Sequence, residues 1–419
     1  MHVVILAEFA VASGGAEKVA VESARALAEA GVEVSFVQAT AGPADPMLDH
    51  PRLRRIGLDL PDVWDLSRGR GAAAGIWHGE AARRLARALD RLPSSPDCLH
   101  LHQWTRALSP AVLPVLLGRG VPVAVTLHDY ALACPNGVYY RFDRGEPCAL
   151  TPLSASCLAA PCDPKSRGHK AVRTARSVAT RIALRCAALD LIHVSDASRA
   201  RLSGLLAGRA LRHHRIDNPV RVGPAAPADP ARGDAVVYVG RLTAEKGADL
   251  VAEAARAAGL PALFIGRGPL EADLRGRAGV EVLDWRSPPE VQAVLRARAR
   301  AVCAPSRWYE TGPLTVYEAL AQGIPAVASA RSGAAERVAD GVTGLVVDPE
   351  PAALAKAFRR LADDDAVRRM GLAAHARYWA APMTLPAHAD ALIALYGRLR
   401  TAETDPATHQ SWAVTAECP

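Results

Sequence analysis

The strongest constraint on the fold is a regular alternation of short apolar runs with helix-like segments. In the first half these segments are 3–7, 16–30, 33–38, 79–92, 98–102 and 121–127. The apolar runs of the second half are 235–239, 262–265, 281–283, 301–304 and 325–329, with helical patterns between them. Such alternation is typical of parallel sheets covered by helices. We therefore predict an α/β protein with two Rossmann-like domains facing a cleft, and ligands at the carboxyl ends of the strands.

The length of 419 residues also favours two domains over one. A stretch rich in Pro, Ala and Gly at 219–234 predicts a linker between an N-terminal domain, 1–218, and a C-terminal domain, 235–384. One more apolar helix is predicted at 385–400, followed by a flexible tail at 401–419. The chain has no apolar run of about 18 residues and no basic leader, so we expect a cytoplasmic protein.

The segment from Pro305 to Pro325 places two carboxylates around the start of a helix. A strand should stop at Pro305 and a helix should begin near Pro313, where a missing N–H costs nothing. Glu310 then lies in the loop and Glu318 inside the helix. The N–H groups that would face a bound anion belong to Thr311, Gly312 and Leu314. Because carboxylates accept hydrogen bonds from sugar hydroxyls, the segment is predicted to hold a sugar diphosphate, although a lone glutamate is more often a solvated acid.

Several blocks of the sequence resemble, in order, those of one enzyme family. They are SGGAEKVAVESARALAEAGVEVSFV from Ser13, IDNPV from Ile216, VVYVGRLTAEKGADLVAEA from Val236, LFIGRGPLEADLR from Leu263 and the segment from Pro305 to Pro349. Together they resemble the retaining glycosyltransferases of the GT-B fold, in the large family 4 group, over nearly the whole chain. The resemblance implies transfer of a hexose-type sugar from a UDP- or GDP-sugar to a polar carbohydrate acceptor, with no required metal. It also implies a C-terminal helix that crosses back to the first domain.

Two cations follow the predicted strand at 235–239. Arg241 and Lys246 lie in GRLTAEKG, so both are expected at a carboxyl end that faces the cleft. A guanidinium and an ammonium can neutralise a diphosphate leaving group without a metal, and the resemblance assigns them this role. The alternative for Lys246 is a surface salt bridge with Glu245, which leaves Arg241 unexplained.

Gly14 and Gly15 lie between the first strand and the first helix, where missing side chains let the backbone approach a ligand. The resemblance implies that this loop covers the donor phosphates, while a simple tight turn is the alternative. His128 ends the strand at 121–127 and could be a core histidine or a partner of Asp129. By resemblance, His128 contacts the transferred sugar.

The resemblance implies further donor contacts after the next two strands. Gly266 would bring the backbone close to the nucleotide, and Trp285 and Arg286 would line the base pocket. A front-face displacement is implied, so no enzyme nucleophile is predicted. The segment at 331–335, RSGAA, departs from the Gly-Gly pair frequent in the family, which affects donor preference. An epimerase on the same fold and a non-catalytic nucleotide-sugar-binding subunit are the alternative functions.

The formal net charge of +7 falls entirely within 1–218. Part of the excess forms a run without acids: Lys165, Arg167, Lys170, Arg173, Arg176, Arg181 and Arg185. The run suits a helix with basic and apolar sides, which predicts either docking on the anionic inner membrane leaflet with a lipid-linked acceptor or a solvated helix face. No nucleic-acid partner is expected, because the aromatic content is only 5% and no binding module is visible.

Four of the eight cysteines cluster in a predicted insertion at 134–162. They are Cys134, Cys148, Cys157 and Cys162. Their spacing contains no C-x-x-C pair, so structural zinc is left open but not predicted. Free thiols in a loop that shapes the acceptor site are the favoured interpretation, since a reducing cytosol disfavours disulfides.

Overall fold

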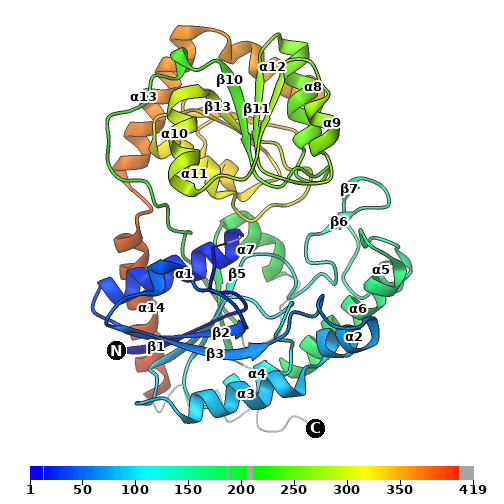
Figure 1. The fold of residues 1–419 in the computed structure, drawn as a ribbon, viewed down its shortest axis with the longest axis vertical. Coiled ribbons are helices and arrows are strands. Elements are labelled where there is room, and N and C mark those ends of the chain that lie inside the picture. Colours follow the sequence, from blue (N-terminus) through cyan, green and yellow to red (C-terminus); the bar gives the residue numbers. More distant parts are fainter. Residues whose placement is uncertain (13, 186–187, 205–210, 405–419) are drawn as a thin grey trace.

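The computed structural model describes residues 1–12, 14–185, 188–204 and 211–404. Two parallel sheets form two lobes, drawn one above the other in Figure 1. The N-terminal sheet has the strand order β3-β2-β1-β4-β5-β8-β9, and the C-terminal sheet has the order β12-β11-β10-β13-β14-β15. The predicted GT-B arrangement of two Rossmann-like sheets is confirmed.

The N-terminal sheet is built around an apolar first strand that is buried on both faces, as parallel sheets require. Its strands are β1 (His2–Ala7), β2 (Glu33–Thr40), β3 (Leu53–Leu60), β4 (Cys98–Leu101), β5 (Val123–Leu127), β8 (Leu189–His193) and β9 (Leu211–Arg215). Its helices are α1 (Gly15–Glu29), α2 (Arg68–Ile76), α3 (Gly79–Asp90), α4 (Val112–Leu117) and α7 (Asp196–Ser203), with the 3-10 turn η1 (Pro46–Leu48).

The C-terminal sheet repeats this plan after residues 219–234, which connect the two sheets. Its strands are β10 (Ala235–Val239), β11 (Ala262–Ile265), β12 (Val280–Leu283), β13 (Ala299–Ala304), β14 (Ala326–Ser329) and β15 (Gly344–Val347). Its helices and 3-10 turns are η2 (Pro230–Arg232), α8 (Ala248–Ala258), α9 (Glu271–Arg275), α10 (Pro288–Arg298), α11 (Leu314–Ala321), η3 (Gly333–Arg337), α12 (Pro351–Leu361) and α13 (Asp364–Ala380). The chain order reverses between β10 and β13, which marks the expected ligand crevice.

Helix α14 (Leu385–Thr404) leaves the C-terminal lobe and packs on the N-terminal lobe (Figure 1). Leu392, Leu395 and Tyr396 are buried in one apolar cluster with residues of β1 and α1. The Tyr396 hydroxyl lies 2.6 Å from Nδ1 of His100 on β4. The predicted crossing helix is confirmed, but it continues to Thr404, so the tail predicted from 401 begins too early; 405–419 lie outside the described residues.

The cysteine-containing insertion at 134–162 contains a short antiparallel pair, β6 (Tyr140–Arg141) and β7 (Glu146–Pro147), and the helix α5 (Ala155–Ala159). The basic helix α6 (Arg167–Ala183) follows it. These elements lie beside the N-terminal sheet and below the C-terminal lobe in Figure 1. Within the described part of the chain, no helix is both long and apolar enough to cross a membrane.

Candidate functional site

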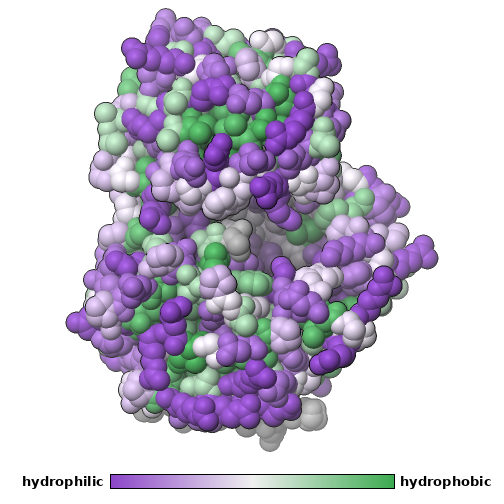
Figure 2. Space-filling model, in the orientation of Figure 1, coloured by the Kyte–Doolittle hydropathy of each residue, from purple (hydrophilic) through white to green (hydrophobic). Residues whose placement is uncertain are grey.

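A hollow separates the two lobes on the face shown in Figure 2, and mostly hydrophilic side chains rim it. The loops that follow β10 and β13 meet there, because both strands end at the same edge of the sheet. The Lys246 ammonium forms an ion pair with Glu310, and the other oxygen of Glu310 accepts the Ser306 hydroxyl. Lys246 therefore pairs with Glu310 and not with Glu245. Ser306 was not predicted as a site residue, although it lies four residues before Glu310 in the same loop.

Arg241 lies in the same loop as Lys246, and its side chain is exposed. Its backbone carbonyl accepts the Tyr238 hydroxyl at 2.7 Å and the Thr243 N–H at 3.0 Å. No carboxylate within the described ranges pairs with the Arg241 guanidinium, which leaves its donors free for an anionic ligand.

The start of α11 adds backbone donors beside these cations. The helix begins at Leu314 after Pro313, and no side chain caps it. Among the described residues, the N–H groups of Thr311, Gly312 and Leu314 have no hydrogen-bond acceptor. The Thr311 hydroxyl instead donates to the backbone carbonyl of His128 at 2.8 Å, which joins the two lobes. An uncapped helix start of this kind can bind a phosphate.

A second lysine reaches the second predicted carboxylate from the opposite lobe. Lys18, in the first turn of α1, lies 2.6 Å from Glu318 of α11. One turn along α1, burial raises the pKa of Glu22 to about 7, although the positive charge of Lys18 opposes this shift. The sequence analysis quoted the segment that contains Lys18 but gave this residue no role.

The two glycines at the start of α1 have different surroundings. A Cβ atom at Gly14 would lie 2.5 Å from Oε2 of Glu17, so the Glu17 carboxylate already fills this space. A Cβ atom at Gly15 would meet nothing within 4 Å. Gly15 is thus the position at which a ligand could approach the backbone.

The loops predicted to hold the nucleotide follow β11 and β12. Gly266 has a φ of +146°, and a Cβ atom there would lie 2.0 Å from the carbonyl oxygen of Gly240. Glycine is therefore required for packing between two loops of the protein, whatever its role toward a nucleotide. Trp285 is 62% exposed, and Arg286 lies 3.7 Å from Glu290. An exposed indole at this position could stack on a base.

His128 is half-buried at the end of β5, on the opposite side of the cleft. Its Nε2 atom lies 3.1 Å from Nδ1 of His102, and the two rings stack. Burial lowers the pKa of His128 to about 3, so the imidazole is neutral at physiological pH. Asp129 accepts the N–H of Ala131 at 2.8 Å and therefore shapes the turn after β5.

The insertion and α7 line a cavity of about 450 Å³ that is open to solvent. Its lining residues are Tyr139, Cys148, Ala149, Leu150, Thr151, Pro152, Ala197, Ala200 and Arg201. The Arg201 guanidinium lies 3.2 Å from the centroid of the Tyr309 ring, next to Glu310 in the sequence. Arg201 forms no ion pair with any carboxylate of the described chain. Helix α7 thus places Arg201 between the insertion and the loop that carries Glu310. The predicted role of the insertion in shaping the acceptor site stays a prediction.

The basic run of α6 faces inward more than predicted. Four of its cations bond to other parts of the protein: Lys170 to cysteine sulfur, Arg173 to Asp163 and Asn136, Arg176 to the Thr105 carbonyl and Arg181 to the Pro152 carbonyl. The exposed members are Lys165, Arg167 and Arg185. Lys165 lies 3.4 Å from the centroid of the Trp64 ring. The basic surface is therefore smaller than the sequence pattern predicted.

The described residues include no group of three or more His, Cys, Asp or Glu side chains placed to hold a metal ion. Cys134, Cys148, Cys157 and Cys162 are buried free thiols in the insertion. The structure therefore gives no support to the zinc alternative at these four cysteines.

Within the segment at 331–335, the backbone has room only for a glycine at position 333. A Cβ atom at Gly333 would lie 2.1 Å from the carbonyl oxygen of Thr311, and the Gly333 N–H donates to the Glu310 carbonyl at 2.8 Å. The next acid, Glu336, accepts the N–H groups of Asp196 and Ala197 and pairs with Arg215 at 2.8 Å. This segment thus supports the Glu310 loop and links the two lobes.

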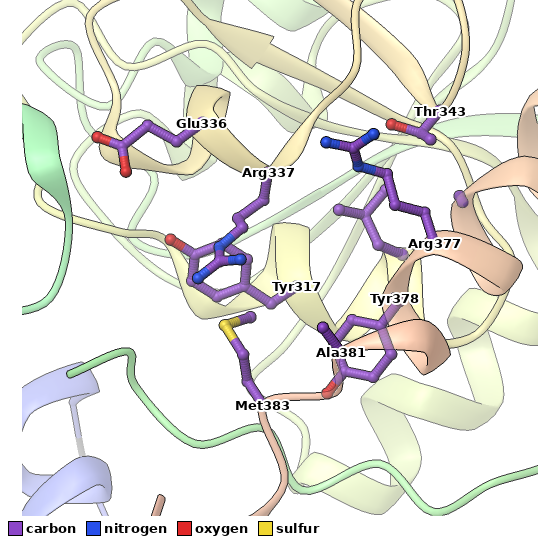
Figure 3. Close-up of a pocket in the computed structure, with 10 residues that line it drawn as sticks. Tyr317, Glu336, Arg337, Thr343, Arg377, Tyr378, Ala381 and Met383 are labelled. Carbon is purple, nitrogen blue, oxygen red and sulfur yellow. The ribbon is translucent and has the colours of Figure 1, made fainter. Parts of the chain in front are cut away.

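A separate cavity of about 260 Å³ lies between α11, η3 and α13. Figure 3 shows that the side chains of Tyr317, Arg337, Arg377 and Tyr378 surround it. None of the predicted donor-site residues lines this cavity. Helix α11 therefore contributes Glu318 to the cleft and Tyr317 to a different cavity.

Comparisons with known proteins agree with this architecture. Residues 226–377 match the family model described as glycosyl transferases group 1, and residues 14–149 match the glycosyl transferase 4-like domain. The chain is 30% identical over 413 residues to D-inositol 3-phosphate glycosyltransferase 1 of Catenulispora acidiphila, covering 92% of this chain and 90% of that protein. It is similar in fold to sucrose-phosphate synthase of Thermosynechococcus elongatus, with a TM-score of 0.69, 21% identity and coverage of 96% and 99%. HepE of Anabaena, solved with UDP and glucose, matches with a TM-score of 0.64, 18% identity and coverage of 95% and 100%.

Proposed function

Because this chain belongs to the glycosyl transferases group 1 family, we propose that it is a retaining enzyme that uses a UDP- or GDP-hexose as donor. The single observation that carries the proposal is the loop in which Lys246 pairs with Glu310 beside the free Arg241 and the uncapped start of α11. This loop offers two cations and several N–H groups to a diphosphate, and a carboxylate to a sugar. Family membership favours group transfer over the epimerase and non-catalytic alternatives.

On binding, the donor would break both lysine–glutamate ion pairs and form its own contacts with the separated side chains. The diphosphate pairs with Arg241 and Lys246. Because Lys246 then leaves Glu310, this carboxylate can accept hydrogen bonds from hexose hydroxyls. The ribose hydroxyls donate hydrogen bonds to Glu318, which breaks its ion pair with Lys18. Trp285 and Arg286 border the base. Gly15 and Gly266 allow the backbone to approach the phosphates and the nucleotide.

Catalysis would then rest on stabilising charge in the leaving group. Arg241, Lys246 and the N–H groups of Thr311, Gly312 and Leu314 would surround the departing diphosphate, where fixed donors stabilise developing negative charge. His128, neutral at physiological pH, would hold a sugar hydroxyl from the other side of the cleft. Because Glu310 would be engaged by sugar hydroxyls in this complex, no carboxylate of the site is assigned as a nucleophile, which fits front-face displacement.

We place the acceptor in the cavity that contains Arg201. Its lining includes Thr151 and Arg201, Arg201 contacts Tyr309 next to Glu310, and its volume of about 450 Å³ has room for a sugar-sized molecule. A guanidinium without a carboxylate partner suits an acceptor with an anionic group. A polyol or carbohydrate that carries a phosphate fits this chemistry, and the relative from Catenulispora acidiphila is named for D-inositol 3-phosphate. A lipid-linked carbohydrate with a diphosphate would offer the same charge, so docking of the cytoplasmic enzyme on the inner leaflet belongs to this proposal.

Calorimetry with a panel of UDP- and GDP-sugars, in excess chelator, tests the donor half of the proposal. Binding should persist without divalent metal, because two cations and a helix start already offset the diphosphate charge. Strict dependence on magnesium or manganese would exclude the proposed site. Proton NMR of the reaction with the best donor then tests the chemistry. An α-linked product from an α-linked donor supports retention, whereas donor conversion without any acceptor would indicate an epimerase.

A further inference from the structure

The insertion buries a lysine against two cysteine sulfur atoms. Lys170 of α6 is 5% exposed, and its Nζ atom lies 3.1 Å from Sγ of Cys162 and 3.8 Å from Sγ of Cys157. No carboxylate of the described chain pairs with Lys170, and the neighbouring Asp163 lies 3.2 Å from Arg173 instead. A buried ammonium without a partner is costly, so the two sulfur atoms are the groups that accommodate it.

The other described cysteines have different environments. Cys134 donates its thiol proton to Oδ1 of Asn136 at 3.1 Å, and burial raises its pKa to about 11. Burial also raises the pKa of Cys148 and that of Cys303 on β13. These three side chains have no ammonium beside them and are expected to stay protonated. Cys157 and Cys162 differ from these three cysteines because the Lys170 ammonium lies within 3.8 Å of both sulfur atoms.

We propose that Cys157 and Cys162 form an oxidation site activated by Lys170, at which a hydroperoxide converts the two thiols into a disulfide. The reactive form of cysteine is the thiolate, and a neighbouring lysine favours it. The Cys162 thiolate attacks one peroxide oxygen, which gives a sulfenic acid and releases water or an alcohol after one proton is taken up. Cys157 then attacks this sulfur, the disulfide forms, and the sulfenic hydroxyl leaves as a second water with the Cys157 proton. The two sulfur atoms lose two electrons in total, and the peroxide gains two.

The position of the site gives the oxidation a structural consequence. A disulfide needs its sulfur atoms about 2.05 Å apart, so the two cysteines must approach each other and give up their present contacts with the Lys170 ammonium. Lys170 then loses both of its partners, and the contact between α6 and the insertion weakens. Because Cys148 to Pro152 of the same insertion line the Arg201 cavity, we expect oxidation to change that cavity, and to lower the melting temperature reversibly.

Peptide mapping of the full-length protein tests the proposal. The protein is treated with hydrogen peroxide at a few equivalents, alkylated, digested and analysed by mass spectrometry. A peptide pair joined through Cys157 and Cys162 should form at least about tenfold faster than any oxidation of Cys303, and a reductant should reverse it. In Cys157→Ser, Cys162 should stop at the sulfenic acid and be trapped by dimedone. In Lys170→Met, the rate at Cys162 should fall to that of Cys303.

Three results would overturn the proposal. The first is oxidation of Cys134 or Cys148 ahead of Cys162 in the wild-type protein, a measurement that needs no variant. The second is an unchanged rate at Cys162 in a folded Lys170→Met protein, with circular dichroism as the check on folding. The third is an equivalent of zinc or iron in the purified protein that peroxide releases, which would identify the four cysteines as metal ligands.

Discussion

Lys18 in the first turn of α1 and Glu318 in α11 form an ion pair of 2.6 Å across the cleft between the two lobes. Their side chains are only 14% and 8% exposed, so the pair is largely shielded from water. A ribose that donates hydrogen bonds to Glu318 must displace Lys18. In the absence of donor, this ion pair thus joins the two lobes, and it competes with the ribose of the proposed donor for Glu318.

Removing Lys18 should destabilise the folded protein. Lys18→Met leaves the Glu318 carboxylate buried without its cation, which should lower the free energy of unfolding by about 1 to 3 kcal/mol. Urea denaturation followed by circular dichroism measures this change. The double variant Lys18→Met with Glu318→Gln should recover much of the loss, because the stranded charge is gone. Equal losses in the single and double variants would show that the stranded Glu318 charge is not the cause of the destabilisation.

Glu22 should make stability depend on pH. Its pKa is raised to about 7 from 4.5, chiefly by burial, so the folded protein holds this proton to higher pH than the unfolded chain does. Between about pH 4.5 and 7 the folded state binds more protons, and the contribution of Glu22 to stability therefore falls as pH rises. Glu22→Gln stays neutral and should become more stable relative to the wild type across this interval. Glu29→Gln, an exposed change on the same helix, is the control; parallel curves for Glu22→Gln and wild type would contradict the assignment.

Glu310 and Glu318 should differ in the function that each loses. Glu310→Ala should abolish turnover and only modestly weaken UDP or GDP binding, because Glu310 is placed to contact the sugar. Glu318→Ala should weaken nucleotide binding by about 1 to 3 kcal/mol, the cost of leaving ribose hydroxyls without a partner. Calorimetry and a turnover assay on the same preparations separate the two effects. Full activity in both variants would mean that neither carboxylate serves the donor.

The central strands of both sheets were predicted from the sequence. The missed strands include the short edge strand β15 of the C-terminal sheet and three strands of the N-terminal sheet that carry polar residues. β1, β10 and β13 are continuous apolar runs, as buried parallel strands usually are. β3 and β9 lie at the edges of the N-terminal sheet and carry the charged and imidazole side chains that conceal a strand pattern. Asp190 interrupts β8, but it is buried against Arg212 and His214 of β9 at 2.6 and 2.7 Å. The pairing of a buried acid with side chains of a neighbouring strand cannot be predicted from the sequence of either strand alone.

The site was predictable where one segment carries both the chemistry and the element that positions it. The Glu310 loop and α11 were located from Pro305, Pro313 and the spacing of the two glutamates. Lys18 was missed because its partner lies 300 residues away and only the packed lobes bring them together. His102 was missed for a similar reason, since its contact with His128 depends on the pairing of β4 with β5.

Arg201 should determine affinity for the acceptor and leave donor binding unchanged. Arg201→Met keeps the length of the side chain but removes the charge and the donors, so KM for an anionic acceptor should rise about tenfold or more. Arg201→Lys should restore only part of the affinity, because an ammonium lacks the planar fork. Calorimetry with UDP and GDP provides the control. A rise in donor Kd together with the acceptor KM would place Arg201 in the donor site instead.

Docking on an anionic membrane should depend on the exposed cations of the basic run alone. Lys165, Arg167 and Arg185 face solvent, and α6 also exposes Val178 and Ile182 at 43% and 68%. Each cation near an anionic surface contributes about 1 kcal/mol, so these three together correspond to roughly a hundredfold in binding.

In a vesicle sedimentation assay, the wild-type protein should bind anionic vesicles at low salt and dissociate at high salt. Changing Lys165, Arg167 and Arg185 to Ser should abolish sedimentation, whereas the matched triple variant of Arg256, Lys356 and Arg360 in the C-terminal lobe should still bind. Lys170, Arg173, Arg176 and Arg181 are unsuitable for this test, since their loss would disturb contacts within the protein. Equal sedimentation with neutral and anionic vesicles, or equal loss in the two triple variants, would exclude electrostatic docking through this helix and favour a soluble acceptor.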